Sequence, residues 1–243
     1  RSGESAITDK HLIAQAFFIN SVDIMRRSAG VLGKTPDVDY YTDLHQKLKE
    51  AFQREYLTPA GRLISSTQTS YVLALHFDLL PESQRQQAAD RLVDNIRRYG
   101  HITTGFLGTP YICHVLTRYG YLDVAYDLLN RTEYPSWLYP VTMGATTIWE
   151  RWDGIKPDGS FQNASMNSFN HYAYGAIGDW MYKTVAGLNL DEQQPGYKHV
   201  IIHPRPGGGL TEARATHNGP YGSIASGWTL DGDRLTMKVN IPP

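Results

Sequence analysis

The feature that most constrains this chain is a repeat of apolar residues at helical spacing, which runs from about residue 11 to residue 187. Steps of three and four residues place side chains on one face of a helix, and the short loops between such stripes make successive helices antiparallel neighbours. The pattern predicts seven helices and a mainly α-helical domain without a sheet. The first stripe consists of Ala14, Phe18, Val22, Met25 and Ala29, and the others begin at Tyr41, Tyr71, Ala89, Tyr111, Leu122 and Met166.

The helical periodicity lapses between Asn130 and Ser165. This stretch of about 35 residues holds three of the five tryptophans of the chain, together with prolines and glycine turns. An irregular segment of this length inside a compact helical domain is typical of a binding or catalytic loop. We therefore expect the functional residues of the chain to lie in or next to this segment.

After Gly187 the pattern changes to that of short strands. Residues 199–203 form one apolar run, and apolar residues alternate over 224–230 and again over 235–241, with the turn pair Asp231-Gly232 between them. This predicts a β-hairpin. The glycine run 207–209 is expected to be a flexible break. The strands are too few to close a sandwich, so the β region is expected either to dock on the helices or to be cut short.

Charge and composition exclude two classes of partner. The chain has 23 Lys and Arg residues against 24 Asp and Glu residues, and nucleic-acid affinity depends on a basic surplus. No run approaches the roughly 18 consecutive apolar residues of a membrane span. We expect a soluble protein without nucleic-acid or membrane partners, whose location the sequence does not give. The single cysteine, Cys113, lies in an apolar helical run and is expected to be buried and inert.

One carboxylate in the irregular segment has the surroundings of a general base. Glu150 lies between Trp149 and Trp152, which would shield it from water, and the adjacent Arg151 would favour its ionisation. Such a group suits the activation of water against a sugar. The alternative is a surface ion pair with the tryptophans packed in the core, and the spacing alone does not decide between them.

The remaining candidates for acid or metal chemistry are weak. Asp153 and Asp158 are the acids nearest to Glu150, but both adjoin glycine in turn-like stretches, where aspartate commonly bonds its own backbone. His199 and His203 are four apart in a predicted strand that ends at a proline, which does not favour a zinc pair. We expect no metal site and no cofactor.

Five runs of the sequence together resemble the bacterial α-L-rhamnosidases. They follow one another in the family's order over most of the chain, and the combination is specific where each run alone is not. The runs are Thr103–Thr109 (TTGFLGT), Pro135–Tyr139 (PSWLY), Thr146–Asp153 (TTIWERWD), Met166–Ala176 (MNSFNHYAYGA) and Pro195–Lys198 (PGYK).

The resemblance implies an (α/α)₆ barrel of twelve helices followed by a β-sandwich, and hydrolysis of terminal non-reducing α-L-rhamnose with inversion. By the same resemblance, Glu150 matches the family's general base and His171 matches a histidine that lines the rhamnose subsite. Trp149, Trp152 and Trp137 lie in matching runs and are expected to form the wall of the cleft, with core packing as the alternative.

The chain matches only part of this pattern. Seven predicted helices are little more than half of twelve, and the acidic motif that carries the family's general acid does not occur. We therefore expect a partial (α/α)₆ toroid of antiparallel helical hairpins over residues 1–187, the C-terminal half of a catalytic barrel, followed by a β-sandwich portion over 188–243.

This partial match has consequences for activity. The isolated chain is expected to be an inactive glycosidase fragment, to leave an apolar face uncovered, and to require the missing N-terminal half of the barrel or a second copy. Two alternatives remain: an inverting hydrolase of the same fold for another sugar, and a binding or scaffold module in which Glu150 and His171 bind a sugar without turnover.

Overall fold

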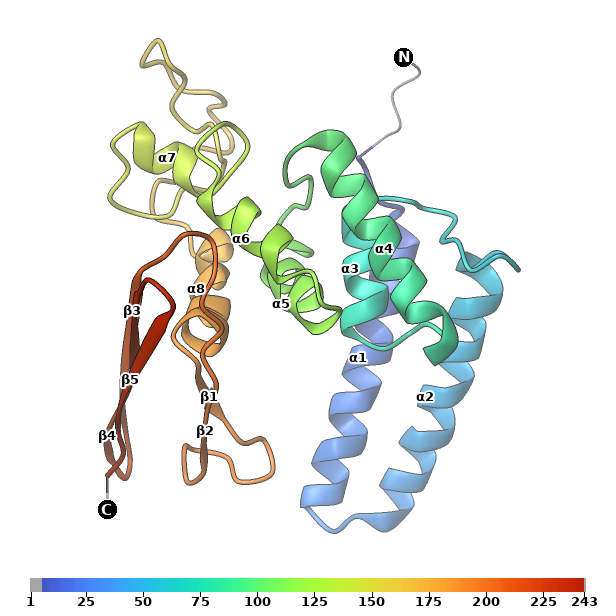
Figure 1. Ribbon diagram of the computed structural model, residues 1–243. Coiled ribbons are helices and arrows are strands. Elements are labelled where there is room, and N and C mark those ends of the chain that lie inside the picture. Colours follow the sequence, from blue (N-terminus) through green and yellow to red (C-terminus); the bar gives the residue numbers. More distant parts are fainter. Residues whose placement is uncertain (1–5, 243) are drawn as a thin grey trace. The chain divides into compact units, whose positions relative to one another are not determined.

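The computed structural model describes residues 6–242, which form two compact units. The first unit runs to Val124 and includes Glu133–Ser136, and the second consists of Ala125–Thr132 and the chain from Trp137 onward. Figure 1 labels the helices and strands of both units.

The regular elements described in the first unit are helices. Two long helices, α1 (Lys10–Val31) and α2 (Thr35–Tyr56), form a hairpin, and α3 (Gln68–His76), α4 (Glu82–Tyr99) and α5 (Thr109–Arg118) follow, before α6 (Leu122–Asn130) leads into the second unit. The side chain of Asp9 caps the first helix by accepting from two backbone N–H groups, and a proline in the first turn starts the second. Each of the first six predicted stripes therefore lies on a helix.

The buried face of α1 differs from the predicted one. Val22 and Ala29 of the predicted stripe are buried, together with Leu12 and Ile19, which the prediction left out. Phe18 and Met25 of the stripe are 53% and 48% exposed. Helix α1 carries apolar residues on more than one face, so the periodicity identifies a helix without selecting the side that packs on α2 and α3.

The hairpin of α1 and α2 leaves large apolar side chains uncovered. Six of them are 48% to 89% exposed: Phe18, Ile24, Met25, Val31, Leu32 and Tyr40. Ile24, Val31 and Leu32 also line one shallow hollow. Contiguous apolar surface commonly marks an interaction surface. The uncovered apolar face along the whole hairpin stays a prediction.

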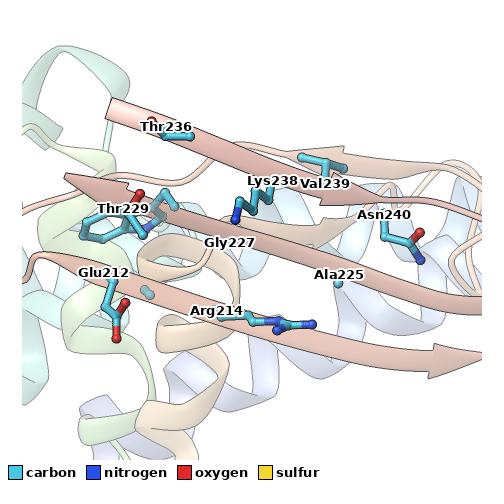
Figure 2. Close-up of a pocket in the computed structure, with 11 residues that line it drawn as sticks. Glu212, Arg214, Ala225, Gly227, Thr229, Thr236, Lys238, Val239 and Asn240 are labelled. Carbon is cyan, nitrogen blue, oxygen red and sulfur yellow. The ribbon is translucent and has the colours of Figure 1, made fainter. Parts of the chain in front are cut away.

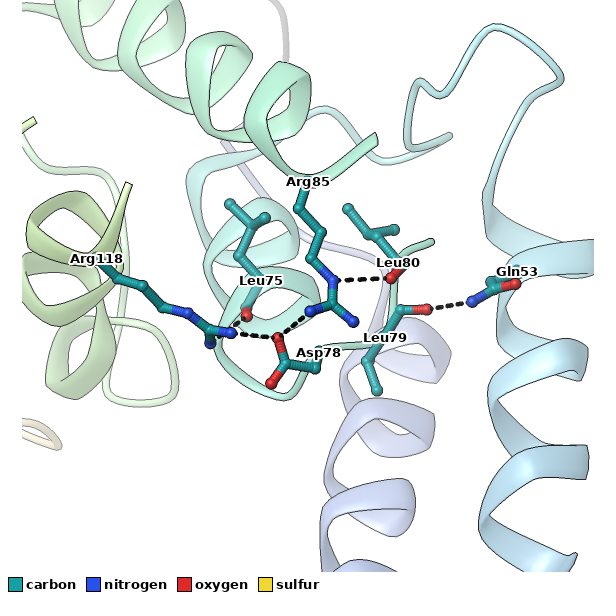
Figure 3. Close-up of polar contacts among 7 residues, drawn as sticks. All are labelled: Gln53, Leu75, Asp78, Leu79, Leu80, Arg85 and Arg118. Carbon is teal, nitrogen blue, oxygen red and sulfur yellow. Dashed lines mark hydrogen bonds and ion pairs between the residues drawn. The ribbon is translucent and has the colours of Figure 1, made fainter. Parts of the chain in front are cut away.

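A cluster of charged groups joins the ends of three helices in this unit (Figure 3). Asp78 follows α3 with a positive φ of 55°, and one of its carboxylate oxygens accepts from Arg118 at 2.7 Å and from Arg85 at 2.9 Å. Arg85 also donates to the carbonyl of Leu80, and Gln53 of α2 donates to that of Leu79. The cluster therefore satisfies carbonyl groups of the loop after α3, and Arg118 adds a bond at 3.4 Å to the carbonyl of Leu75 in the last turn of the helix.

We expect the substitution Asp78→Ala to lower the free energy of unfolding by about 2 kcal/mol, because alanine loses the arginine contacts and tolerates the left-handed backbone poorly. Asp78→Gly loses the same contacts but accepts the backbone angle, so about 1 kcal/mol is expected. Denaturant unfolding followed by far-UV circular dichroism measures both. Equal losses for the two variants would contradict the contribution assigned to the backbone angle.

The second unit contains short helical segments and all the strands. A short helix, α7 (Leu138–Thr142), lies within the otherwise irregular region, and a 3₁₀ turn (Ala173–Ala176), α8 (Ile177–Trp180) and a π-helical turn (Met181–Val185) form one continuous helical stretch. The seventh helix was predicted to begin at Met166, and this is wrong. Side chains compete for the backbone before residue 173: Asn163 accepts from the amide of Ser165, and Ser168 accepts from that of Asn170.

Two antiparallel sheets follow this helical stretch. One pairs β1 (Leu188–Leu190) with β2 (Val200–Ile202), and the other has the order β3 (Glu212–Gly219), β4 (Gly222–Asp231) and β5 (Arg234–Asn240). The predicted hairpin is confirmed as β4 and β5, with Asp231 paired to Arg234 across the turn. Strands β3 and β1 were not predicted. The sequence of β3 (EARATHNG) has no alternation of large apolar residues, and Ala215 is the one residue of this strand that is buried.

The three-stranded sheet docks on the end of the helical stretch through hydrogen bonds as well as apolar contacts. The indole of Trp228 donates to the carbonyl of Val185 and the hydroxyl of Ser226 donates to that of Ala186, both at 2.7 Å. Beside these bonds, Leu188 and Ile224 belong to a shared apolar core. Carbonyl groups at the end of a helix lack intrahelical partners, so the sheet acts as a cap for this helix.

Glycine residues at two sites allow close contacts near the place where the sheets follow the helical stretch. Gly187 has a φ of +74°, and a Cβ atom there would overlap the backbone of His203 and Pro204. The glycine run 207–209 is not the flexible break that we predicted. A Cβ atom on Gly207 or Gly208 would lie 2.6 or 2.5 Å from the ring of Tyr126, so the run is a close-packed crossing.

Cys113 is buried, as predicted, and burial raises the pKa of its thiol. Within residues 6–242, none of the helices combines the length and the apolar character that crossing a bilayer demands.

Candidate functional site

Two irregular segments of the second unit lie against each other through their backbones. The amide of His171 donates to the carbonyl of Ile148 at 2.8 Å, and the amide of Glu150 donates to that of Ser168 at 2.9 Å. The hydroxyl of Thr147 adds a further bond to the carbonyl of Phe169. This ladder brings the backbone around Glu150 next to the backbone around His171, although the two residues are 21 positions apart.

The Glu150 side chain is half-buried and is held from one side. Its Oε2 accepts from the amide of Ser168 at 3.1 Å, so the same pair of residues is joined by two hydrogen bonds. In the part of the chain that the structure describes, Oε1 makes no hydrogen bond. One oxygen is therefore fixed and the other is available to accept from a ligand or from water.

The acids around Glu150 have structural partners. Arg151, which is adjacent to Glu150 in the sequence, pairs with Asp153 at 3.3 Å. Asp153 also accepts from Gln162 at 2.6 Å across the loop. The hydroxyl and then the amide of Ser160 hold the pKa of Asp158 below its ordinary value in a local turn, as its sequence context predicted.

The three candidate tryptophans differ in exposure. Trp149 is 5% exposed and meets Phe169 edge to face, and Trp137 is 8% exposed and donates its indole N–H to the carbonyl of Tyr174 at 3.0 Å. Trp152 is half-buried, with its ring stacked on that of Tyr174 at 3.7 Å and edge-on to Trp137. Of the three, Trp152 keeps the most surface for a ligand.

His171 lies two residues before the helical stretch. Its Nδ1 accepts from the amide of Ala173 at 3.4 Å, an arrangement in which the neutral ring carries its proton on Nε2. Its ring is parallel to that of Tyr172, with centroids 5.7 Å apart. Tyr172 is 88% exposed, so an aromatic face adjoins the histidine at the surface.

The sequence analysis missed Ser168 and Tyr172 as site residues. Ser168 acts through its backbone amide, for which the residue type gives no signal. Tyr172 is one of two tyrosines in the run Asn170–Tyr174, and only the structure separates the exposed ring of Tyr172 from the buried ring of Tyr174.

Other parts of the described chain do not add to this site. Over residues 6–242, no three His, Cys, Asp or Glu side chains are grouped so as to hold a metal ion. A groove of about 580 Å³ crosses the three-stranded sheet (Figure 2). Glu212, Arg214 and Lys238 flank its floor of Ala225 and Gly227, and none of the candidate residues lines it.

Comparison with known families gives two matches that together cover nearly the whole chain. The family model described as the bacterial alpha-L-rhamnosidase 6 hairpin glycosidase domain matches residues 1–185, and the model of the bacterial alpha-L-rhamnosidase C-terminal domain matches residues 187–243. The mainly helical chain with two small sheets agrees with these descriptions.

Individual proteins similar to this chain are named alpha-L-rhamnosidases. The chain is 46% identical over 237 residues to an alpha-L-rhamnosidase of Streptomyces avermitilis and 43% identical over 239 residues to one of Formosa agariphila. Each match covers 97% of this chain, but 23% and 26% of the respective relative. The chain thus spans about a quarter of the length of these relatives.

Solved structures match equally well. The crystal structure of the Streptomyces avermitilis alpha-L-rhamnosidase complexed with L-rhamnose superposes with a TM-score of 0.93 over 98% of this chain and 23% of that one. The alpha-L-rhamnosidase of Aspergillus terreus, 40% identical, gives a TM-score of 0.93 over 97% of this chain and 28% of that one.

Proposed function

This chain belongs to the bacterial alpha-L-rhamnosidase family, and on that premise we propose that it supplies the general base and part of the sugar subsite of an enzyme that hydrolyses terminal α-L-rhamnosides with inversion. The observation that carries the proposal is the backbone ladder between the segments of Glu150 and His171. It brings together the backbone segments of two residues, Glu150 and His171, that the sequence resemblance had selected separately.

In the proposed mechanism Glu150 takes a proton from the attacking water. The amide of Ser168 holds Oε2, which fixes the carboxylate plane and leaves Oε1 to accept from the water. As the water attacks the anomeric carbon, its O–H bond breaks and the proton passes to Glu150. On the opposite face of the sugar the bond to the leaving oxygen breaks, and that oxygen takes a proton from a general acid. An inverting glycosidase needs its two carboxyl groups about 6.5–9.5 Å apart to leave room for this water.

The second carboxyl, a general acid, is proposed to come from the part of the barrel outside this chain. Asp153 and Asp158 are engaged in loop and turn contacts, which argues against either as the acid. We propose that residues 1–187 form the C-terminal half of a catalytic barrel, with residues 188–243 as a β-sandwich portion. The natural partner is then the N-terminal half of that barrel, and the uncovered apolar face of α1 and α2 is the surface that it would cover.

The sugar subsite is proposed to lie around His171. The imidazole is proposed to lie beside a hydroxyl group of rhamnose. The exposed ring of Tyr172, parallel to that of His171, and the half-buried ring of Trp152 are proposed to contact the apolar face and methyl group of the sugar. Trp149 and Trp137 are proposed to support this wall from behind, because both are buried.

The test is an assay of a complete enzyme, in which this chain is joined to the preceding part of the barrel. We expect release of rhamnose from an aryl α-L-rhamnoside, with the β-anomer as the first product seen by NMR, and no turnover by the chain alone because it lacks the acid. His171→Ala is expected to weaken rhamnose binding roughly tenfold, the effect of one lost hydrogen bond to a polar ligand.

The control for His171 is His199→Ala, which removes an exposed histidine paired with Asp191 beside the small sheet. This variant is expected to bind rhamnose normally. A complete enzyme that released glucose as readily as rhamnose would point to an inverting hydrolase for another sugar. Tight rhamnose binding without any turnover would point to a binding module.

A further inference from the structure

The ring of Trp152 rests on a tyrosine that belongs to the segment of His171. Trp152 lies outside any helix or strand, in a turn closed by a bond from the amide of Gly154 to the carbonyl of Arg151. Its ring is stacked on that of Tyr174, with centroids 3.7 Å apart and ring planes 16° apart. Tyr174 is 8% exposed and lies in the 3₁₀ turn, three positions after His171. The stack is thus a side-chain contact between the two segments that the backbone ladder joins.

A second tryptophan locks this stack. The carbonyl of Tyr174 accepts from the indole N–H of Trp137 at 3.0 Å, and the ring of Trp137 meets that of Trp152 edge-on, with centroids 5.7 Å apart. Each of the three residues therefore contacts the other two. Stacked and edge-to-face arrangements are the ones that aromatic rings prefer. The set fixes the place of the Trp152 ring although the backbone around it is irregular.

The polar group of Trp152 differs from those of two other tryptophans. The indole N–H groups of Trp137 and Trp228 donate to backbone carbonyls. Among the described residues, the indole N–H of Trp152 has no such partner, and it does not belong to the side-chain polar atoms that are buried without one. A buried tryptophan usually pairs its N–H, so a half-buried ring with an unpaired N–H suits a ligand from outside.

From these contacts we infer that Tyr174 is a positioning residue for the sugar subsite. The inference rests on the proposed function, in which Trp152 contacts the sugar. Tyr174 is too buried to offer much surface to a ligand, and it acts by supporting Trp152 and tying its position to that of His171. Loss of the Tyr174 ring should weaken binding of the sugar equally in the ground state and the transition state, and so raise KM with little change in kcat.

The experiment compares Tyr174→Leu with Tyr174→Phe in the complete enzyme. Leucine removes the flat ring, so KM for an aryl α-L-rhamnoside is expected to rise about three- to tenfold, the usual contribution of an aromatic contact, while kcat stays within about twofold. Phenylalanine keeps the ring and should hold KM within about twofold of the unaltered enzyme.

A spectroscopic readout follows the Trp152 ring without any substrate. In enzyme labelled with 5-fluorotryptophan, the fluorine NMR signal of Trp152 is assigned by its loss in Trp152→Phe. This signal should move in Tyr174→Leu, because the fluorine loses the ring current of the stacked tyrosine, and should stay in place in Tyr174→Phe.

Trp152→Ala provides the double-mutant comparison. If Tyr174 acts through Trp152, Tyr174→Leu should have no further effect on KM once Trp152 is replaced, whereas independent sites would add. The matched control is Tyr126→Leu, since Tyr126 is another buried tyrosine that meets a tryptophan, Trp180, with centroids 5.2 Å apart. It should lower the stability to denaturant without changing KM. If circular dichroism shows that Tyr174→Leu does not fold, Tyr174→Met takes its place, because methionine fills the space without a flat ring.

Additive losses from Tyr174→Leu and Trp152→Ala would overturn the positioning role. So would a fall in kcat at unchanged KM, a Trp152 signal that does not move, or an unchanged KM in Trp152→Ala. Absence of rhamnoside turnover by the unaltered complete enzyme would contradict the proposed function and this inference together, whereas normal turnover with additive losses would contradict the inference alone.

Discussion

In the complete enzyme, Glu150→Gln is expected to lower kcat for a rhamnoside by about 100-fold to 10,000-fold, the usual effect of removing a general base. Glutamine keeps the shape of the side chain, and its carbonyl oxygen can still accept from the amide of Ser168, so the loop should retain its position. What is lost is the ability to take a proton from the attacking water. Rhamnose binding should therefore change little, and steady-state kinetics together with calorimetry measure the two effects separately.

The leaving group gives this experiment a second readout. Loss of a base should slow the hydrolysis of activated and unactivated aryl rhamnosides alike, whereas loss of an acid should spare those whose leaving group needs no proton. Glu55→Gln, on the exposed surface of α2, is the matched control and should be fully active. Near-normal turnover by Glu150→Gln would show that another residue activates the water. A loss seen only with poor leaving groups would make Glu150 the acid.

Gly187→Ala is expected to have the largest effect on stability. The left-handed φ of +74° strains any residue with a Cβ by about 1–2 kcal/mol, and the added methyl group would overlap the backbone around Pro204. Backbone cannot swing aside as a side chain does, so a further 1–3 kcal/mol or more is expected from overpacking. The sum is about 4 kcal/mol, enough to release the sheets from the helical stretch.

Tryptophan fluorescence suits this measurement, because all five tryptophans (Trp137, Trp149, Trp152, Trp180 and Trp228) lie in the second unit. Gly232→Ala is the matched control, since Gly232 also has a positive φ, of 55°, but a Cβ there meets nothing within 4 Å. It should lose only the backbone contribution of about 1–2 kcal/mol. If both variants unfolded at the same denaturant concentration, the overlap of the added methyl group with the backbone around Pro204 would not contribute to the loss of stability.

Sequence periodicity predicted the helices of the first unit well where the apolar residues of a helix lie on one face and that face is buried. The stripe Ala89, Leu92 and Ile96 on α4 is buried as predicted. The method failed for α1, where apolar residues surround the helix and the choice of face depends on its neighbours. It also failed at residue 166, where apolar spacing continues through Phe169 but serine and asparagine side chains bond the backbone in place of a helix.

The candidate site was predicted in part. Glu150 and His171 were selected by resemblance, and nothing in their spacing revealed the ladder that joins their segments. Arg151 shows the limit of reasoning from neighbours in sequence. The chain turns at this point, with the amide of Gly154 donating to the carbonyl of Arg151, and Arg151 contacts Asp153 two positions on, not Glu150 beside it. The partner of Glu150 is a backbone amide 18 residues away, which no side-chain pattern encodes.

The cap that the three-stranded sheet places on the helical stretch has a consequence for how the chain can be divided. The two family models meet between residues 185 and 187, so a boundary drawn from sequence similarity falls there. The carbonyls of Val185 and Ala186 are the ones that Trp228 and Ser226 hold, and Gly187 is the residue that allows the chain to turn. The boundary between the family models therefore falls where hydrogen bonds join the helical stretch to the three-stranded sheet. Cutting the chain there would expose the carbonyls of Val185 and Ala186 on one side and the indole N–H of Trp228 on the other. A cut at this boundary would therefore separate two parts of the chain that these hydrogen bonds join.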